Sequence, residues 1–246
     1  IVGCSTLLRE RDLGASVAKG IEVIHPNAQA QGKLVEDILD VSRIITGKLR
    51  LELKPTNLAA IVDDAVEVVR ASALAKRIEI QVVRNGEQTR LVADPERLQQ
   101  VVWNLLSNAV KFTEPGGKIT VDVQQLSSKL VLTVRDTGRG IEPEFLPYVF
   151  DRFKQADSST TRRVGGLGLG LAIVRHIVEQ HGGQVQARSE GLGKGSSFMI
   201  ILPIRAVTSS LDASGEPSTR AVDLEQQRAT ISLDGVSGLV VVDVQD

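Results

Sequence analysis

The chain has 246 residues, of which 42% are hydrophobic and 24% are charged, and 29 basic residues against 30 acidic ones leave a net charge of −1. This composition is that of a globular protein with one or two domains, and it excludes a largely disordered or fibrous chain. The near-neutral charge gives no basis for binding nucleic acid. The single cysteine, Cys4, excludes an internal disulfide and a metal cluster built from thiolates.

The sequence shows no sign of a membrane segment. No apolar run approaches the roughly 18 residues that a spanning helix needs, and the N-terminus lacks the charged-then-apolar pattern of a secretion signal. We therefore expect a cytoplasmic chain without direct membrane contact, whose parent protein could itself be membrane-anchored. The chain begins with Ile1 in place of methionine, which suggests a fragment.

Residues 1–54 have the pattern of a helical hairpin. A less regular helix is expected over about residues 2–29, with a kink at Pro26. After it, apolar residues recur at spacings of three and four, as in a helix of a bundle or coiled coil: Leu34, Ile38, Val41, Ile45 and Leu49, with Val35, Leu39 and Ile44 beside them. A hairpin within one chain and a dimerising hairpin would bury the same stripe, so both alternatives stay open.

Helix and strand patterns mix in residues 55–204. Asn57 is expected to cap one helix, and Asp94, followed by Pro95, to cap another whose apolar residues recur at threes and fours. A further helix is expected to start near Gly170. Strands are expected at 78–82, 119–123, 130–134, 184–189 and 197–202, the second and third of them forming an antiparallel hairpin. The order of these elements predicts an α+β sandwich.

The C-terminal segment changes in character. Residues 205–235 are rich in polar side chains without apolar periodicity, which is typical of a linker. Residues 236–246 contain one short apolar strand, Leu239–Asp243, and we expect them to begin a further domain that is cut off here.

The helix that Asp94 opens carries an unusual polar stripe. Asn104, Asn108 and Lys111 follow one line about 120° from the centre of its apolar face. The stripe is either a solvated face or a ligand-facing surface. In the second case, an asparagine oxygen would coordinate a hard cation and the lysine would supply a charge for phosphate.

Two glycine-rich segments follow. Asp136-Thr137-Gly138-Arg139-Gly140 comes directly after an expected strand, so it is either a common turn or a place where backbone and carboxylate approach a flat ligand. Residues 165–171 open a helix, where glycines free backbone N–H groups for anionic oxygens. Their spacing matches neither the P-loop nor the dinucleotide fingerprint. The polar run Gln155–Val164 before them is a candidate lid that would order around a bound ligand.

In this order, the segments resemble the ATP-binding domain of sensor histidine kinases, within the superfamily of gyrase, chaperone, histidine kinase and mismatch-repair ATPases. The five similar motifs are the N box at 104–113, the first glycine box at 136–140, the F box at 150–153, the second glycine box at 166–171 and the third at 193–196. Five motifs in the expected order make the resemblance specific.

The resemblance implies a two-layer α/β sandwich with a mixed sheet and helices on one face, and it implies ATP and Mg²⁺ as ligands. Asn104, Asn108 and Lys111 would form the catalytic set, with Asn108 as the metal ligand and Lys111 on phosphate. Asp136 would accept a hydrogen bond from the adenine amino group. The full set of implied ATP-binding residues is Asn108, Lys111, Asp136, Gly138, Gly140, Arg162, Arg163, Gly166, Gly168, Leu169, Gly170, Leu171 and Ser197.

The resemblance also suggests which reaction the site supports. Hydrolysing relatives carry a glutamate base at the position of Asn104, and an amide cannot activate water, which favours phosphoryl transfer to a protein histidine and then to a response-regulator aspartate. A nucleotide-binding scaffold without transfer activity, or an ATP-hydrolysing member of the superfamily, are the alternatives.

Residues 34–48 resemble the second helix of the family's dimerisation and phosphoacceptor hairpin, which implies a homodimer and a response-regulator receiver domain as partners. None of His25, His176 and His181 lies in an acceptor motif of the family. We therefore expect the acceptor histidine outside this chain, and no autophosphorylation of the chain by itself. The segment 236–246 would then begin a receiver-like domain, as in a hybrid kinase.

Overall fold

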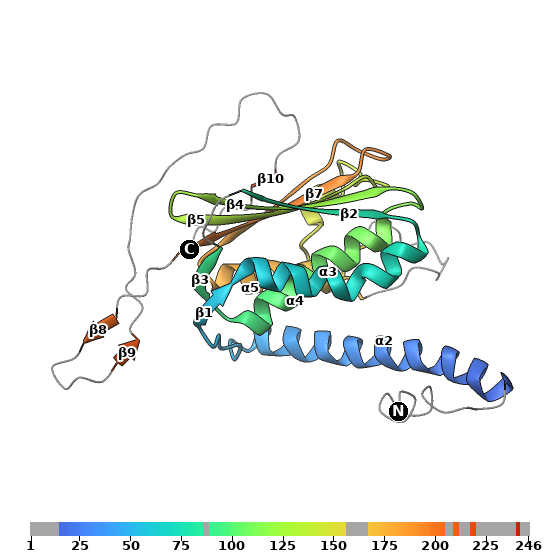
Figure 1. The fold of residues 1–246 in the computed structure, drawn as a ribbon, viewed down its shortest axis with the longest axis horizontal. Coiled ribbons are helices and arrows are strands. Elements are labelled where there is room, and N and C mark those ends of the chain that lie inside the picture. Colours follow the sequence, from blue (N-terminus) through green and yellow to red (C-terminus); the bar gives the residue numbers. More distant parts are fainter. Residues whose placement is uncertain are drawn as a thin grey trace.

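The computed structural model describes residues 15–85, 89–155 and 167–204, and three short strands at 209–211, 217–219 and 240–241. A mixed sheet forms one layer and three helices cover one of its faces, while a long helix lies beneath this helical layer (Figure 1). The expected α+β fold, with a mixed sheet and helices on one face, is confirmed.

The helices are α2 (Ala15–Ile45), α3 (Leu58–Ala75), α4 (Pro95–Phe112) and α5 (Gly170–Gln180), with a 3₁₀ turn at Leu146–Tyr148. The main sheet has the order β10-β6-β7-β5-β4-β2. Its strands are β2 (Glu79–Asn85), β4 (Lys118–Leu126), β5 (Lys129–Asp136), β6 (Gln184–Arg188), β7 (Ser196–Pro203) and β10 (Val240–Val241). The β2–β4 pair is parallel and the other neighbours are antiparallel.

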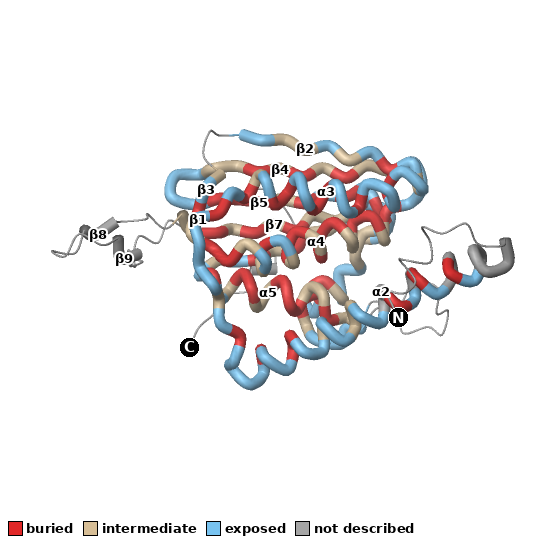
Figure 2. The backbone as a smooth tube through the Cα atoms, turned by 60° about the horizontal axis from the view of Figure 1, so that its bottom comes forward, coloured by how far each residue is buried: buried red, intermediate tan, exposed pale blue. Residues whose placement is uncertain are grey.

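The core lies between the sheet and the α3–α4–α5 layer, as burial along the chain shows (Figure 2). Every second residue of β4 is buried from Ile119 to Val123, and every second residue of β5 from Leu130 to Asp136, with Val131 buried as well. A strand with one face on a core alternates inward and outward side chains. Helix α4 meets them with apolar residues at spacings of three and four: Leu98, Val101, Val102, Leu105, Leu106 and Ala109. Each fully buried aliphatic side chain contributes about 1.5–3 kcal/mol.

The expected helix starts are confirmed. The side chain of Asn57 accepts a hydrogen bond from Ala59 N, and Asp94 Oδ1 accepts one from Arg97 N at 3.1 Å. A small antiparallel ribbon, β1 (Lys54–Asn57) with β3 (Arg90–Ala93), leads into both helices. This ribbon was not expected, because strands of four residues give too short an apolar alternation to be recognised.

The expected hairpin at the N-terminal end is not found in the described residues, where α2 runs as one helix through Pro26. A proline inside a helix removes one backbone hydrogen bond, but the turns on either side keep theirs, so a helix of 31 residues continues past it. The expected division of this segment into two helices is therefore wrong for the described residues. His25 is a buried residue within α2.

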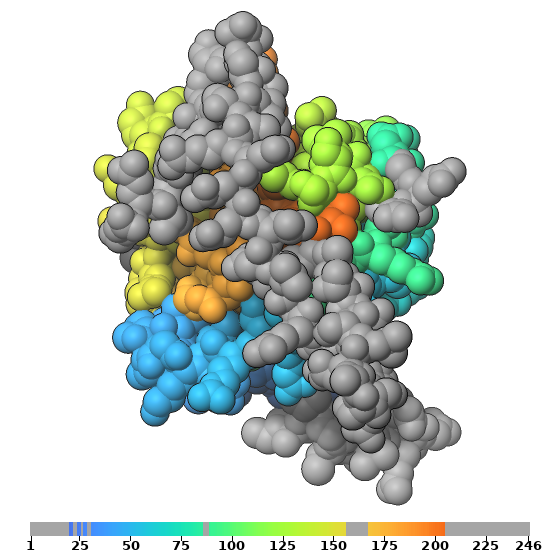
Figure 3. Space-filling view, turned by 90° about the vertical axis from the view of Figure 1, so that its left-hand side faces the viewer, coloured from blue at the N-terminus to red at the C-terminus, as the bar shows by residue number. Residues whose placement is uncertain are grey.

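The single apolar seam expected on this helix is divided between two faces. Val41 and Ile44 are buried, while Ile38 and Ile45 are 52% and 64% exposed. The buried side faces the helical layer, and the surface of α2 (blue) borders that of α5 (orange) in the space-filling view (Figure 3). A helix that packs obliquely on another keeps only part of its stripe in contact.

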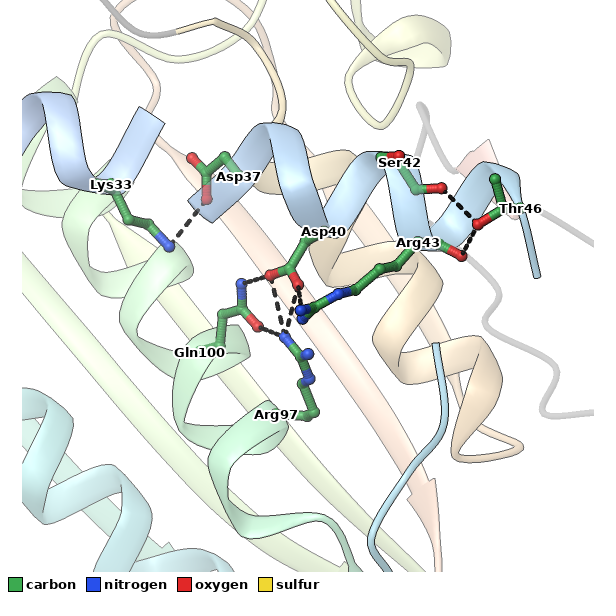
Figure 4. A network of polar contacts seen from close by, with 8 residues as sticks. All are labelled: Lys33, Asp37, Asp40, Ser42, Arg43, Thr46, Arg97 and Gln100. Carbon is green, nitrogen blue, oxygen red and sulfur yellow. Dashed lines mark hydrogen bonds and ion pairs between the residues drawn. The ribbon is translucent and has the colours of Figure 1, made fainter. Parts of the chain in front are cut away.

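Polar contacts fix α2 against α4. The buried carboxylate of Asp40 accepts from Arg97 Nη1, at 3.0 Å to each oxygen, and from Gln100 Nε2 at 2.7 Å (Figure 4). Arg43 approaches the same carboxylate to 3.8 Å. Helix α2 is thus docked on the helix that carries the asparagine stripe.

The C-terminal segment contributes three short strands. β8 (Ser209–Leu211) and β9 (Pro217–Thr219) form an antiparallel ribbon in the region expected to be a linker. β10, in the segment expected to begin another domain, pairs antiparallel with β6 and so adds a strand to the edge of the main sheet. Within the described part of the chain, no helix combines the length and the apolar character that crossing a membrane requires.

Candidate nucleotide-binding site

The polar stripe on α4 lies beside the start of α5. Asn104 is 5% exposed, and its Nδ2 lies 3.5 Å from the backbone oxygen of Gly170, the first residue of α5. Asn108 and Lys111, one and two turns further along α4, are half-buried. The stripe is therefore not a solvated face, since its first member is buried against the glycine-rich segment.

The ammonium group of Lys111 is held in a position that favours an anionic ligand. Burial lowers the pKa of Lys111 below that of an ordinary lysine, and the nearby charge of Arg139 lowers it further. Both cations lie over the ring of Phe112, Lys111 Nζ at 4.8 Å and Arg139 Cζ at 4.4 Å from its centre. Because the charged form of Lys111 is disfavoured here, a phosphate beside it would offset that cost.

The C-terminal end of α4, from which Lys111 projects, is itself fixed by a lysine. Lys76 Nζ donates to the backbone oxygens of Val110, Lys111 and Thr113, at 2.8, 2.9 and 3.2 Å. A cation at this end satisfies carbonyl groups that have no partner within the helix and complements its dipole. Sequence reasoning missed Lys76, because the contact joins residues that are 34 to 37 positions apart.

Asp136 ends β5 as a buried carboxylate, 5% exposed. Its Oδ1 accepts from Gly138 N at 2.8 Å, and its Oδ2 accepts from Ser196 Oγ at 2.5 Å. Each oxygen has a second lone pair, so the group can still accept from a ligand amino group. The two contacts fix the orientation of the carboxylate and therefore the direction of its unused lone pairs.

The serine at Asp136 is Ser196, whereas the sequence analysis selected Ser197. Asp136 and Ser196 are directly opposite each other in the β5–β7 pair, while Ser197 is opposite Arg135 and Arg188. Because strand side chains alternate between faces, Ser197 lies on the other face of the sheet. The strand period contains the missing signal, since Phe198, which is buried in the core, shares a face with Ser196.

The loop after Asp136 approaches α4 closely. A Cβ atom on Gly138 would lie 2.3 Å from the backbone oxygen of Phe112, so this position requires glycine. The following residues are tied to the third glycine motif, because Gly193 N donates to Arg139 O at 2.7 Å and Gly195 N donates to Gly138 O at 3.1 Å. Gly140 also lies where these two loops, the one after Asp136 and the one before β7, are in contact.

The described part of the second glycine motif leads into α5. Gly168 has φ +69°, and a Cβ there would lie 2.7 Å from Lys154 O, so the turn requires glycine. Leu169 is buried in the core, so only its backbone can meet a ligand, and Leu171 is partly buried against the same core. The first N–H groups of α5 have no partner within the helix and can bind an anion. Arg162, Arg163, Gly166 and the expected lid from 156 on lie outside the described residues.

The F-box segment joins this motif to the core. Phe150 is buried and makes an edge-to-face contact with Phe198, with ring centres 6.3 Å apart. Phe153 N donates to Gly168 O at 3.1 Å, and the Phe153 side chain is 64% exposed. The segment therefore links the glycine turn at Gly168 to strand β7, which carries both Phe198 and Ser196.

The donor set suits a hard cation bound together with a ligand. Among the described residues, no group of three His, Cys, Asp or Glu side chains could hold a metal ion by itself. A half-buried asparagine, Asn108, offers one amide oxygen on the polar stripe of α4. Mg²⁺ commonly takes few protein ligands and completes its shell with water and phosphate oxygens, so Asn108 fits an ion that arrives with phosphates.

These groups come from three separate parts of the chain, and they meet where the end of β5 and the start of α5 both lie against α4. They offer an ammonium group and free helix N–H groups for phosphate, an amide oxygen for a cation and a carboxylate for an amino group. The arrangement suits a nucleotide, with its base at Asp136 and its phosphates between α4 and α5.

Comparison with known proteins agrees with this geometry. Residues 93–206 match the family described as histidine kinase-, DNA gyrase B- and HSP90-like ATPase. Hybrid signal transduction histidine kinase D of Dictyostelium discoideum is 38% identical, over 82% of this chain and 16% of its own length. The chain thus spans about a sixth of that curated relative.

Two solved structures share the fold. Full-length ShkA in complex with AMPPNP superposes with a TM-score of 0.68 at 28% identity, covering 87% of this chain and 45% of that chain. The mycobacterial sensor histidine kinase MprB superposes with a TM-score of 0.54 at 30% identity, covering 61% of this chain and 97% of that one.

Proposed function

Because the chain belongs to the histidine kinase family and contains its ATP-binding catalytic domain, we propose that it binds Mg·ATP at the described site and transfers the γ-phosphoryl group to a protein histidine. The proposal is supported by two contacts on α4, that of Asn104 Nδ2 with Gly170 O at the start of α5 and that of Arg139 N with Phe112 O in the loop after Asp136. Together they would put the proposed phosphate-binding and base-binding groups beside one helix.

Each residue has a distinct part in this proposal. Asp136 accepts from the adenine amino group, and Gly138 and Gly140 let the backbone approach the base. Lys111, the N–H groups at the start of α5 and the arginines 162 and 163 bind phosphate oxygens, while Asn108 would hold Mg²⁺ against them. When bound, Mg²⁺ supplies charge neutralisation between the phosphates.

Asn104 favours transfer over hydrolysis. Its amide cannot take a proton from water, and the contact of its Nδ2 with Gly170 O directs the amide towards α5 as a structural group. The buried position, 5% exposed, likewise suits a residue that orders the two helices. A phosphoryl group is then passed to an external protein nucleophile that approaches the site.

The metal assignment predicts a specific loss for Asn108→Ala. We expect calorimetry to show about tenfold weaker ATP binding in the presence of Mg²⁺, because one ligand of the ion is lost, and equal binding of both proteins when EDTA removes the ion. Gln99→Ala, which removes an exposed amide elsewhere on α4, is the matched control and should change neither affinity. A loss of equal size with and without Mg²⁺ would contradict a metal ligand at Asn108.

We also propose that α2 contributes to a homodimer. Its outward face carries exposed apolar side chains that no described residue covers fully: Val35, Ile38, Leu39 and Ile45, all at least half exposed. A second copy of the helix would bury them at the spacing of a bundle seam.

A charge on that face tests the dimer. Ile38→Asp is expected to shift the protein towards monomer in light scattering over a concentration series, because a carboxylate at the centre of an apolar seam is costly to bury. Leu74→Asp, an equivalent change at an exposed position of α3, should leave the mass unchanged. A monomeric wild-type protein at every concentration would rule out the proposed dimer.

The remaining partners follow from the family. We propose that the phosphoryl group passes on to the aspartate of a response-regulator receiver domain, and that the parent works in the cytoplasm. We further propose 55–204 as the catalytic unit, 205–235 as a linker and 236–246 as the start of a receiver-like domain. The Dictyostelium relative is named a hybrid kinase, which supports a parent protein of the hybrid type. The pairing of β10 with β6 would then bring the start of that domain to the catalytic sheet.

A further inference from the structure

His181 joins the two helices of the proposed nucleotide site at the end far from the phosphates. It follows α5 directly and is 5% exposed. Its Nδ1 lies 2.7 Å from the backbone oxygen of Ile177 on α5, and its Nε2 accepts from the backbone N–H of Asp94 at 3.0 Å. One imidazole thus bridges the C-terminal end of α5 and the N-cap of α4.

The two contacts specify one form of the ring. A carbonyl oxygen can only accept, so the nitrogen facing Ile177 carries the proton. A backbone N–H can only donate, so the nitrogen facing Asp94 has a free lone pair. The bridge therefore requires a neutral imidazole protonated at Nδ1.

The bridge lies at a point where other contacts meet. Besides donating to His181, Asp94 accepts from Arg97 N as the cap of α4 and from Glu52 N, in the segment after α2, at 2.9 Å. Asp94 is 6% exposed, so its backbone N–H cannot readily turn to water if the imidazole is removed.

The position of α4 relative to α5 matters for the site. The helices run antiparallel, since the start of α4 meets the end of α5 at Asp94 and His181, and Asn104 meets the start of α5 at Gly170. The Asn104 contact is long, at 3.5 Å, whereas both His181 contacts are of ordinary hydrogen-bond length. The tighter tie between the two helices is thus at His181.

We propose that His181 is a positioning residue for nucleotide binding, which sets α4 and α5 in the relative position that lets Asn108 and Lys111 share the phosphates with the start of α5. The inference rests on the proposed function, because it concerns the same nucleotide site. Without the bridge, the helices sample several relative positions. The affinity for the nucleotide then falls in proportion to the fraction of molecules that still have the binding-competent arrangement.

Two substitutions separate the contacts of the ring. His181→Gln places an amide oxygen near the position of Nε2 and keeps an acceptor for Asp94 N–H. His181→Asn places an amide nitrogen near the position of Nδ1, which keeps the donor to Ile177 O but leaves Asp94 N–H without its partner. His176→Gln, on α5 itself, is the control, since His176 lines a surface hollow with Arg152 and Glu179.

Calorimetry of Mg·ATP binding, well below the unfolding temperature of every variant, tests the proposal. We expect His181→Asn to weaken binding roughly tenfold, and His181→Gln and His176→Gln to stay within about twofold of wild type. Amide hydrogen exchange without nucleotide should show faster exchange at Asp94 in the asparagine variant alone.

Two results would overturn the positioning role. The first is that His181→Asn binds ATP like wild type while its unfolding temperature drops, which would make His181 a stabilising residue only. The second is that the glutamine variant loses as much affinity as the asparagine variant, which would show that the acceptor for Asp94 is not what matters. A wild-type chain that binds no ATP would instead refute the proposed function.

Discussion

Asp136→Asn is expected to weaken ATP binding by roughly a hundredfold or more, the largest loss of any single change in the site. The buried carboxylate accepts from Gly138 N and from Ser196 Oγ, and both oxygens are already engaged when a ligand arrives. In asparagine, an NH2 group replaces one of the two carboxylate oxygens. This group can only donate, and it would face Gly138 N, Ser196 Oγ or the adenine amino group where an acceptor stood before. Calorimetry with ATP and with adenosine measures the loss.

Comparison of the two ligands separates base recognition from phosphate binding. Because Asp136 is proposed to contact the base, ATP and adenosine should lose affinity by the same factor. Asp122→Asn is the matched control, since Asp122 is a strand aspartate on β4 whose Oδ2 accepts from Gln124. It should leave both affinities unchanged. An Asp136→Asn protein that loses affinity for ATP but not for adenosine would contradict the assignment of Asp136 to adenine.

The fold could be predicted to a large extent because its signals are local. Alternation marked β4 and β5, spacings of three and four marked α4, and the caps at Asn57 and Asp94 marked where helices begin. The helix α2 was predicted less well, because two helices were expected where one is continuous, and because the same apolar stripe fits a buried or an exposed seam. Which residues of that stripe are covered depends on the partner helix, and the sequence of α2 does not contain this information.

The site could be predicted where a motif is continuous in sequence, and it could not where contacts join distant residues. The stripe on α4 and the carboxylate at the end of β5 were recognised from residue type and spacing. Ser196, Lys76 and His181 contact residues 34 to 87 positions away, so their roles depend on strand register and helix packing. Of these, only Ser196 had a usable local signal, because it shares a face with Phe198.

The contact between α2 and α4 leads to the second large effect, which is on stability. Asp40 has a side chain that is 8% exposed, and its partner Arg97 is 22% exposed. Arg97→Met would remove the cation that lies 3.0 Å from the buried carboxylate, and would leave it only Gln100 and the more exposed Arg43 at 3.8 Å. Breaking one side of such a pair costs about 3–5 kcal/mol, because the desolvated charge remains. Urea unfolding should show a loss of this size, and hydrogen exchange should locate the loosening in α2.

A double-mutant cycle tests whether the charge is the cause. If the stranded carboxylate is responsible, Asp40→Leu together with Arg97→Met should recover most of the loss, since two apolar side chains can pack where the ion pair was. Arg70→Met breaks the ion pair with Glu67 on α3, whose two side chains are 57% and 70% exposed, and should cost less than about 1 kcal/mol. If Arg97→Met costs no more than Arg70→Met, α2 is held by its apolar contacts, and the ion pair is not what docks it.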